Sequence, residues 1–235
     1  MNAASKPPDE LWVCHMGLVP YSGGLAIQET LRARRQASEL PDTLLLLEHP
    51  PVYTRGRRSA AGELPFGEDF YRDKGIEVLD TDRGGRITYH GPGQLVGYPI
   101  MDVTDVVAHL RTIEDAIVEA LAEAGVHAHA RPEDGPDYTG VWVEDRKIAS
   151  LGVHVSRGIS THGFAVNVCN DLDPFSWVVA CGLPDVRMTS LAAETNGEDE
   201  SLACFRERVA HSFCSAHSRR QRLVSQERLL EAVPA

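Results

Sequence analysis

A glycine-rich stretch over residues 83–94, RGGRITYHGPGQ, combines polar side chains with a permissive backbone. Glycines allow tight turns and a close approach to a ligand, and the Arg, Tyr, His and Gln side chains could orient a polar group. The stretch differs from the nucleotide-binding pattern GxGxxG, and no Walker-type Gly-Lys pair follows it. The residues alone leave a second interpretation open, a glycine-rich hairpin that contains a buried histidine.

Lysine is scarce, because Lys6, Lys74 and Lys147 are the only lysines among 23 basic residues. Arginine does not deprotonate in proteins, whereas lysine can, so a lysine kept in an arginine-rich sequence is a candidate for proton transfer. Lys147 begins the segment KIASLG, whose small residues would leave space beside its side chain in a pocket. The alternative is a surface lysine on the edge of a strand.

The five cysteines are Cys14, Cys169, Cys181, Cys204 and Cys214. They are odd in number and lack CxxC spacing, which fits neither a disulfide framework nor a zinc site. Cys181 follows the apolar run WVVA and precedes Gly182, so its thiol could lie at the end of an element beside a flexible backbone. The alternative is a small buried apolar side chain, the usual role of a lone cysteine.

Two other groups of side chains carry less chemistry. His127 and His129 alternate along one predicted strand, but neither cysteine nor carboxylate follows at metal-binding spacing, so we predict surface histidines and no metal site. Arg55, Arg57 and Arg58 form a small basic cluster in a long loop, where charged side chains are usually solvated.

The composition predicts an ordinary globular protein of 235 residues, with 43% hydrophobic and 24% charged residues. The net charge of −11 argues against a nucleic-acid binder, which needs a basic face for phosphates. The first residues lack the pattern of a secretory signal, and the longest apolar run, residues 44–47, is far too short to span a bilayer. We therefore expect a cytoplasmic protein without a membrane partner.

The hydrophobic pattern predicts one α/β domain over residues 11–222, built on a mixed central β-sheet flanked by helices. Residues 1–10 are predicted to be a flexible tail, and residues 223–235 a mobile C-terminal tail. Strands are expected over residues 11–18, 44–48, 76–80, 126–130, 139–143, 147–156 and 163–168, with a strand pair around the glycine-rich stretch. Helices are expected over residues 21–40, 106–124 and 203–222, and a long loop over residues 50–68.

Five sequence blocks together identify a family. They are EHPPVYTRG (48–56), RGGRITYHGPGQLVGYPI (83–100), KIASLG (147–152), HGFAVNV (162–168) and ACGLPDVRMTSL (180–191). In order and spacing they resemble the octanoyltransferases of lipoate biosynthesis, also called lipoyl(octanoyl) transferases. This resemblance implies a fold like that of the biotin/lipoate protein ligases.

The resemblance also implies roles for individual residues. Cys181 would be the nucleophile that forms an acyl thioester, and Lys147 would lower the pKa of that thiol and move protons. The substrate-binding walls would be formed by Arg83, Gly84, Gly85, Arg86, Ile87, Thr88, Tyr89 and His90, by Ser150, Leu151 and Gly152, and by Gly163, Phe164 and Ala165. The family has a proline before its Cys-Gly pair, and Ala180 stands there in this chain. Cys169 lies outside that block and is expected to be non-catalytic.

The implied reaction moves an octanoyl group from octanoyl-acyl carrier protein to a lysine of a lipoyl domain, without a cofactor. The implied acceptors are the lipoyl domains of 2-oxoacid dehydrogenase complexes and the glycine cleavage H protein, and the chain is expected to act as a monomer. An ATP-dependent lipoate or biotin ligase is the nearest alternative. A cysteine hydrolase that pairs Cys181 with His90 or His162 and a silent carrier-binding module are two others.

Overall fold

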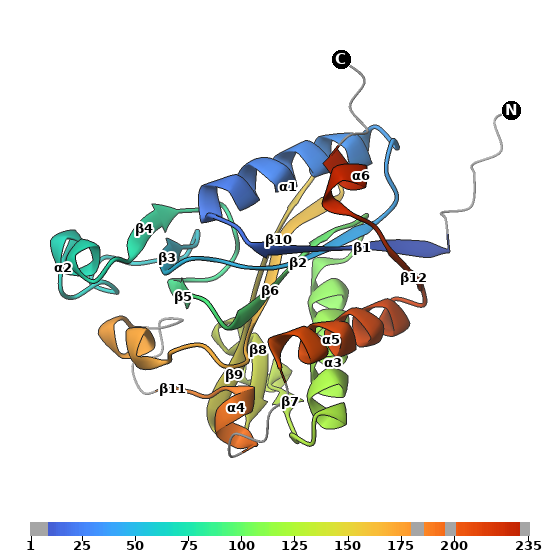
Figure 1. Ribbon diagram of the computed structural model, residues 1–235. Coiled ribbons are helices and arrows are strands. Elements are labelled where there is room, and N and C mark those ends of the chain that lie inside the picture. Colours follow the sequence, from blue (N-terminus) through green and yellow to red (C-terminus); the bar gives the residue numbers. More distant parts are fainter. Residues whose placement is uncertain (1–8, 180–185, 196–200, 231–235) are drawn as a thin grey trace, which may run out of the picture.

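The computed structural model describes residues 9–179, 186–195 and 201–230 (Figure 1). The strands are β1 (Glu10–Leu18), β2 (Thr43–Glu48), β3 (Val52–Arg55), β4 (Glu77–Asp80), β5 (Thr88–His90), β6 (Gln94–Ile100), β7 (His129–Ala130), β8 (Gly140–Val143), β9 (Arg146–Ser156), β10 (Ile159–Asn167), β11 (Arg187–Met188) and β12 (Arg220–Leu223). The α-helices are α1 (Tyr21–Gln36), α2 (Glu68–Asp73), α3 (Val106–Glu123), α4 (Leu191–Glu194), α5 (Leu202–Ala216) and α6 (Gln226–Leu230). Short 3₁₀ helices are η1 (Pro132–Asp134), η2 (Pro136–Tyr138) and η3 (Asp173–Trp177).

The central sheet is mixed, as the sequence predicts. Among the described residues its nine strands follow the order β12-β1-β2-β6-β10-β9-β8-β7, and β11 pairs with β9. Strand β1 is parallel to β2 and β12, whereas the pairs β2–β6, β6–β10, β10–β9 and β9–β8 are antiparallel. The leucines of β2 are buried on both faces of the sheet, which is why this strand reads as an unbroken apolar run.

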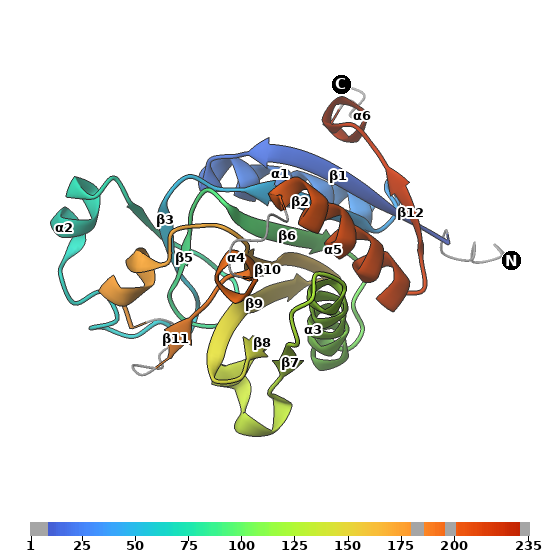
Figure 2. The same cartoon turned by 60° about the horizontal axis from the view of Figure 1, so that its bottom comes forward.

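Helices cover both faces of the sheet (Figures 1 and 2). Helix α3 is capped at its N-terminus by Asp105, whose carboxylate accepts hydrogen bonds from the backbone N–H groups of Val107 and Ala108. Its residues Ile113 and Ile117 are fully buried and pack with α5 against one face of the sheet. Helices α1 and α6 lie on the other face, where Leu31 and Leu229 are fully buried.

A second, smaller sheet lies beside the first and has the order β4-β3-β5. Strand β3 lies inside the range 50–68, where a long loop was predicted, so that prediction was wrong for residues 52–55. The strand is only four residues long, and the Pro, Gly and Arg residues that flank it conceal its pattern. Tyr53, Tyr71, Tyr89 and Phe175 form an aromatic cluster that joins this sheet to α2 and η3.

The C-terminal part also differs from the prediction of one helix over residues 203–222. Helix α5 ends at Ala216, the chain turns at Ser218, which has a positive φ of 53°, and β12 pairs with β1. The side chains of β12 are all exposed, so this edge strand shows no apolar alternation that could have revealed it. Within the range predicted as a mobile tail, α6 packs through Leu229, and Arg34 donates a hydrogen bond to the Leu229 carbonyl at 2.8 Å.

In the described part of the chain, none of the helices is both long and apolar enough to cross a lipid bilayer.

Replacing Ile117 with alanine should lower the free energy of unfolding by about 2–5 kcal/mol, because it leaves a cavity between α3 and the sheet. Val107→Ala on the same helix is the matched control, since that side chain is 63% exposed and its loss should change stability by less than about 0.5 kcal/mol. Urea denaturation followed by circular dichroism measures both changes. Equal effects of the two substitutions would contradict the packing of α3 described above.

Candidate functional site

A cavity of about 310 Å³ lies between the glycine-rich turn and strands β9 and β10 of the central sheet. Its lining residues are Tyr21, Arg58, Arg83, Gly84, Gly85, Arg86, Ile87, Thr88, His90, Val96, Tyr98, Val106, Leu110, Pro136, Asp137, Thr139, Lys147, Ser150, Leu151, Gly152, Val153, His162, Gly163, Phe164 and Ala165. The segments that meet here are far apart in the sequence, and the pairing of β9 with β10 brings two of them together.

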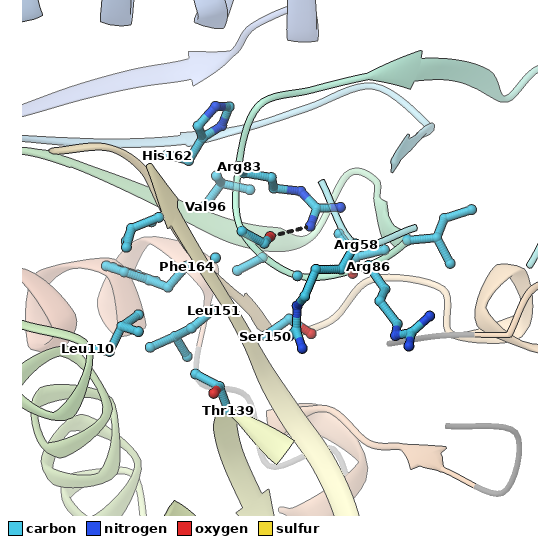
Figure 3. Close-up of a pocket in the computed structure, with 18 of the residues that line it drawn as sticks. Arg58, Arg83, Arg86, Val96, Leu110, Thr139, Ser150, Leu151, His162 and Phe164 are labelled. Atoms are coloured by element: carbon cyan, nitrogen blue, oxygen red, sulfur yellow. Dashed lines mark hydrogen bonds between the residues drawn. The ribbon is translucent and has the colours of Figure 1, made fainter. Parts of the chain in front are cut away.

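The lining is chemically divided, and Figure 3 shows the division. Leu110, Leu151 and Phe164 lie on one side, and Arg58 and Arg86 on the other. The charged side is organised by ion pairs, because Arg58 pairs with Asp137 at 2.8 Å and Arg86 with Glu63 at 2.9 Å. The cavity can therefore hold an apolar chain that carries a polar group at one end.

The structure brings together nearly all of the wall residues proposed from the sequence. Arg83, Gly84, Gly85, Arg86, Ile87, Thr88, His90, Ser150, Leu151, Gly152, Gly163, Phe164 and Ala165 all line the cavity. Tyr89 does not line it. Successive side chains of a strand point to opposite sides, so Thr88 and His90 face the cavity while Tyr89 packs against Tyr53 and Phe175, with ring centroids 5.5 Å apart in each pair.

Arg83 braces the glycine-rich turn against the small sheet. Its guanidinium donates to the carbonyl and hydroxyl oxygens of Thr54 at 2.5 and 2.7 Å, and to the carbonyl of Gly84 at 3.0 Å. Gly56 permits this close approach, since a Cβ atom there would lie 2.5 Å from the carbonyl oxygen of Gly85 and 2.8 Å from Arg83 Nη1. Gly56 is therefore required for the glycine-rich turn to pack against this segment.

The orientation of His90 is fixed by a hydrogen-bond network. The side-chain amide nitrogen of Gln94 donates to Asn167 Oδ1 at 2.9 Å, so its oxygen accepts from His90 Nδ1–H at 2.8 Å. Nε2 of His90 is then the unprotonated acceptor, with the hydroxyl of Thr54 at 3.4 Å. Burial, together with nearby His49 and Arg83, holds the pKa of His90 well below its usual value, which keeps the ring neutral.

Two further histidines stand behind or beside the cavity wall. His49 donates from Nδ1 to the Val19 carbonyl at 2.6 Å, and its Nε2 accepts from the hydroxyl of Tyr98 at 2.6 Å. Burial lowers the pKa of His49 to about 4. His162 lines the cavity with a positive φ of 56°, and its Nε2 lies 2.7 Å from Asp82 Oδ1. Burial likewise lowers the pKa of His162, so the wall contains neutral imidazoles.

Lys147 lies in the cavity wall and is 1% exposed, which excludes the alternative of a surface lysine. Strand β9 has a bulge here: Lys147 pairs with Trp142 and Ala149 with Val141, so Ile148 is an extra residue. The bulge places Lys147 and Ser150 on the same side of the strand, although residues three apart normally lie on opposite sides.

Cys181 and Ala180 lie outside the described residues, whereas the chain on both sides of them is described. On the near side, the backbone N–H of Val179 donates to the carbonyl of Glu63 at 3.0 Å. On the far side, β11 pairs with β9 so that Met188 lies opposite Lys147, and the N–H of Thr189 donates to the Lys147 carbonyl at 3.0 Å. The chain that follows residues 180–185 therefore runs beside the backbone of Lys147.

The remaining candidates lie away from the cavity. Cys169 is exposed and does not line the cavity. Partial desolvation of its thiol, together with the negative charge of Glu48, raises the pKa of that thiol. His127 and His129 are exposed. No group of three or more His, Cys, Asp or Glu side chains suited to a metal ion was found in the part of the chain that the structure describes.

Sequence reasoning missed several lining residues. Tyr21, Val96, Tyr98, Val106, Leu110, Pro136, Asp137, Thr139 and Val153 had no assigned role. Arg58 was considered only as part of the basic cluster, and His162 only as a residue that could line a pocket or partner a hydrolase cysteine. Tyr98 and His162 stand inside the family blocks and could have been found there. Leu110 belongs to an ordinary apolar helix pattern, and the segment 136–139 carries no sequence signal of a ligand site.

The lipoyl protein ligase A/B catalytic domain matches residues 20–214 of the chain, and this match defines the class of the protein. Among solved structures, lipoate-protein ligase A bound with ATP superposes with a TM-score of 0.73 at 20% identity, covering 93% of this chain and 91% of the other. A bi-partite lipoate protein ligase of Thermoplasma acidophilum superposes with a TM-score of 0.69 at 19% identity, covering 93% and 89%. At this identity the structures support the fold alone, and the predicted likeness to lipoate protein ligases is confirmed.

Curated relatives are closer in sequence. An octanoyltransferase of Acidothermus cellulolyticus is 49% identical over 189 residues, which are 77% of this chain and 80% of the relative. An octanoyltransferase of Caldicellulosiruptor saccharolyticus is 39% identical over 229 residues, which are 95% and 96% of the two chains. The chain belongs to the octanoyltransferase family, a family of acyltransferases.

Below neutral pH the buried His49 should destabilise the fold. Its pKa of about 4 lies below the usual value of 6.5, so between these values only the unfolded chain binds the proton. The free energy of unfolding should fall as the pH drops from 6.5 towards 4, by up to about 3 kcal/mol from this group. Urea denaturation from pH 7.5 to 5 measures the slope, which His49→Gln should reduce by about one proton and His127→Gln, at an exposed position, should leave unchanged. A wild-type slope in His49→Gln would contradict the neutral state of this ring.

Proposed function

We propose that the protein transfers an octanoyl group from octanoyl-acyl carrier protein to the lysine ε-amine of lipoyl domains, through a thioester on Cys181. The observation that carries the proposal is Lys147, buried in the wall of a divided cavity, with the chain that follows Cys181 paired to its backbone. Membership of the octanoyltransferase family supports the identity of the transferred group as octanoyl. The apolar and polar sides of the cavity support the proposed way in which this group is bound.

The apolar side of the cavity suits the octanoyl chain. Seven methylene or methyl carbons that leave water contribute roughly 5 kcal/mol of gross driving force, at about 0.8 kcal/mol for each carbon. Leu110, Leu151 and Phe164 supply the apolar surface for them. The carbonyl end would then lie toward the polar residues of the lining, which include Lys147.

The first half-reaction needs a thiolate. An unperturbed cysteine has a pKa of about 8.5 and is ionised to only a few per cent at neutral pH. The ammonium of Lys147 favours the thiolate of Cys181, which attacks the thioester carbonyl of the donor. A bond forms between the Cys181 sulfur and the acyl carbon, and the bond to the carrier sulfur breaks. The leaving carrier thiolate takes a proton from the Lys147 ammonium, so Lys147 is neutral in the acyl-enzyme. One thioester replaces another, so no ATP is consumed.

The second half-reaction forms an amide. The ε-amine of the acceptor lysine attacks the acyl-enzyme, its nitrogen bonds to the acyl carbon, and the Cys181 sulfur leaves. Neutral Lys147 accepts the proton that the amine loses, a step that arginine could not perform. Amide formation makes the overall reaction favourable, and the covalent intermediate predicts ping-pong kinetics.

The same proposal names partners and conditions. The acceptors are lipoyl domains of 2-oxoacid dehydrogenase complexes and the glycine cleavage H protein, and the enzyme works as a cytoplasmic monomer without a cofactor. Both carriers present their reacting group on a flexible arm, so a narrow cavity is sufficient.

Mixing the protein with octanoyl-acyl carrier protein in the absence of ATP should add one octanoyl group. The wild type and Cys169→Ala should both gain this mass, because Cys169 lies away from the cavity, and Cys181→Ala should not. Lys147→Arg should form the acyl-enzyme but transfer it to a lipoyl domain at least about 100-fold more slowly, because a general base typically contributes that much. Intact mass spectrometry follows both steps.

Each other outcome identifies an alternative. Acylation that requires ATP would show that the protein is a ligase and not a transferase. Release of free octanoate without a lipoyl domain would indicate a hydrolase. A label that follows Cys169 would show that the nucleophile was assigned to the wrong cysteine.

The exposed arginines next to the cavity provide a docking surface for an acidic acyl carrier protein. Arg57 and Arg58 are both exposed, and Arg58 lines the cavity. Arg55 pairs with Asp80 at 2.7 Å and Arg58 with Asp137 at 2.8 Å, so the test is made at Arg57. Arg57→Glu should raise the KM for the carrier about threefold to tenfold at low salt, and the effect should shrink at 0.5 M salt. Arg220→Glu on the distant strand β12 is the control, and an equal KM for both variants at low salt would contradict this docking surface.

A further inference from the structure

The indole ring of Trp142 forms a platform for the Lys147 side chain. The two residues are paired across β8 and β9 and lie on the same side of the sheet, with Nζ of Lys147 5.2 Å from the ring centroid. Trp142 is fully buried, and its Nε1–H donates to the carbonyl of Tyr138 at 3.0 Å. The ring is thus held firmly, and its electron-rich face attracts the ammonium.

Gly140 closes the slot in which this side chain lies. A Cβ atom at Gly140 would lie 2.5 Å from Lys147 Cε, 3.2 Å from its Nζ and 2.4 Å from the carbonyl oxygen of Ala149. The φ angle of Gly140 is +146°, which other residues rarely adopt. The buried carboxylate of Glu114 accepts a hydrogen bond from the Gly140 N–H at 2.8 Å, so α3 fixes this wall of the slot.

The platform is itself braced by a second cation. The guanidinium of Arg131 lies 4.9 Å from the ring centroid of Trp142 and 4.7 Å from that of Tyr138. Arg131 also pairs with Asp134 at 2.5 Å. These contacts hold the ring independently of Lys147, so its position does not depend on the side chain that it supports.

We propose that Trp142 is a positioning residue, whose ring face holds the Lys147 ammonium where it can serve the acyl transfer. A lysine side chain has four flexible carbons and loses rotamer freedom when it is fixed in one place. The ring and the Gly140 slot impose that restriction before substrate binds, which lowers the cost of reaching the reactive arrangement. This inference rests on the proposed function, because it assigns Lys147 to the reaction.

The first test compares Trp142→Phe with Trp142→Leu. Phenylalanine keeps a π face, whereas leucine removes it, so Trp142→Leu should lower kcat about 10- to 30-fold and Trp142→Phe by less than about 5-fold. The KM for octanoyl-acyl carrier protein should stay within about twofold, since Trp142 is not among the residues that line the cavity. Trp12→Leu is the matched control, because Arg222 lies 5.7 Å over the Trp12 ring on the far edge of the sheet.

The second test weakens the negative potential on the face of the Trp142 ring while the size and packing of the ring stay nearly the same. In a Trp12→Phe/Trp177→Phe background, Trp142 is the only tryptophan, and it can be replaced biosynthetically by mono-, di- and trifluorotryptophan. Each fluorine weakens the π face, so the rate of acyl transfer relative to this background should fall stepwise while the thermal midpoint stays constant.

The outcomes are separable. A wild type that forms no octanoyl-enzyme defeats the proposed function itself. A wild type that is acylated, with rates that are independent of fluorination and a folded Trp142→Leu that keeps the wild-type kcat, overturns the role of Trp142. If Trp142→Leu does not fold, the fluorinated series alone decides.

Discussion

The extra residue in strand β9 determines which of its side chains face the cavity. In a regular strand without the bulge, Lys147 and Ser150 are three residues apart and would point to opposite sides of the sheet, since strand side chains alternate. With it, Lys147 and Ser150 face the cavity, while Ile148 and Ala149 both join the apolar core beneath α3 and α5. One inserted residue thus connects the packing of the core to the chemistry of the site.

The glycine-rich turn depends on the same strand. The N–H of Gly84 donates to the carbonyl of Val153 on β9 at 3.0 Å, and a Cβ atom at Gly152 would lie 2.7 Å from the carbonyl oxygen of Gly84. The turn belongs to the connection between β4 and β5 of the small sheet and rests on the central sheet. The cavity therefore lies where the two sheets meet. Its width is set by direct backbone contacts at glycines, where no side chain intervenes.

The sequence predicts the long helices and strands and the local sequence blocks better than it predicts how they pack together. The apolar spacing of Ile113, Ile117 and Leu121 correctly predicts α3, and the mixed α/β class follows from the alternation of strands and helices. Strands β3 and β12 were not predicted, because β3 is only four residues long and the side chains of β12 are all exposed.

The wall residues were found because they cluster in recognisable blocks, and Tyr89 differs because strand alternation turns it away from its neighbours. Leu110 and Thr139 could not be found from the sequence, since only the tertiary fold brings α3 and the segment before β8 to the cavity. The bulge at Ile148 is a property of strand pairing, and the segment KIASLG does not reveal it.

The pairing of β1 with β12 has a consequence for the newly made chain. Glu10 and Arg220, which pair across these strands, are 210 residues apart, so β1 leaves the ribosome long before its outer neighbour exists. During that interval the nine residues of β1 present an open hydrogen-bonding edge, which invites pairing with other nascent chains. A chaperone that covers this edge until β12 is made would therefore raise the fraction of chains that reach the native state.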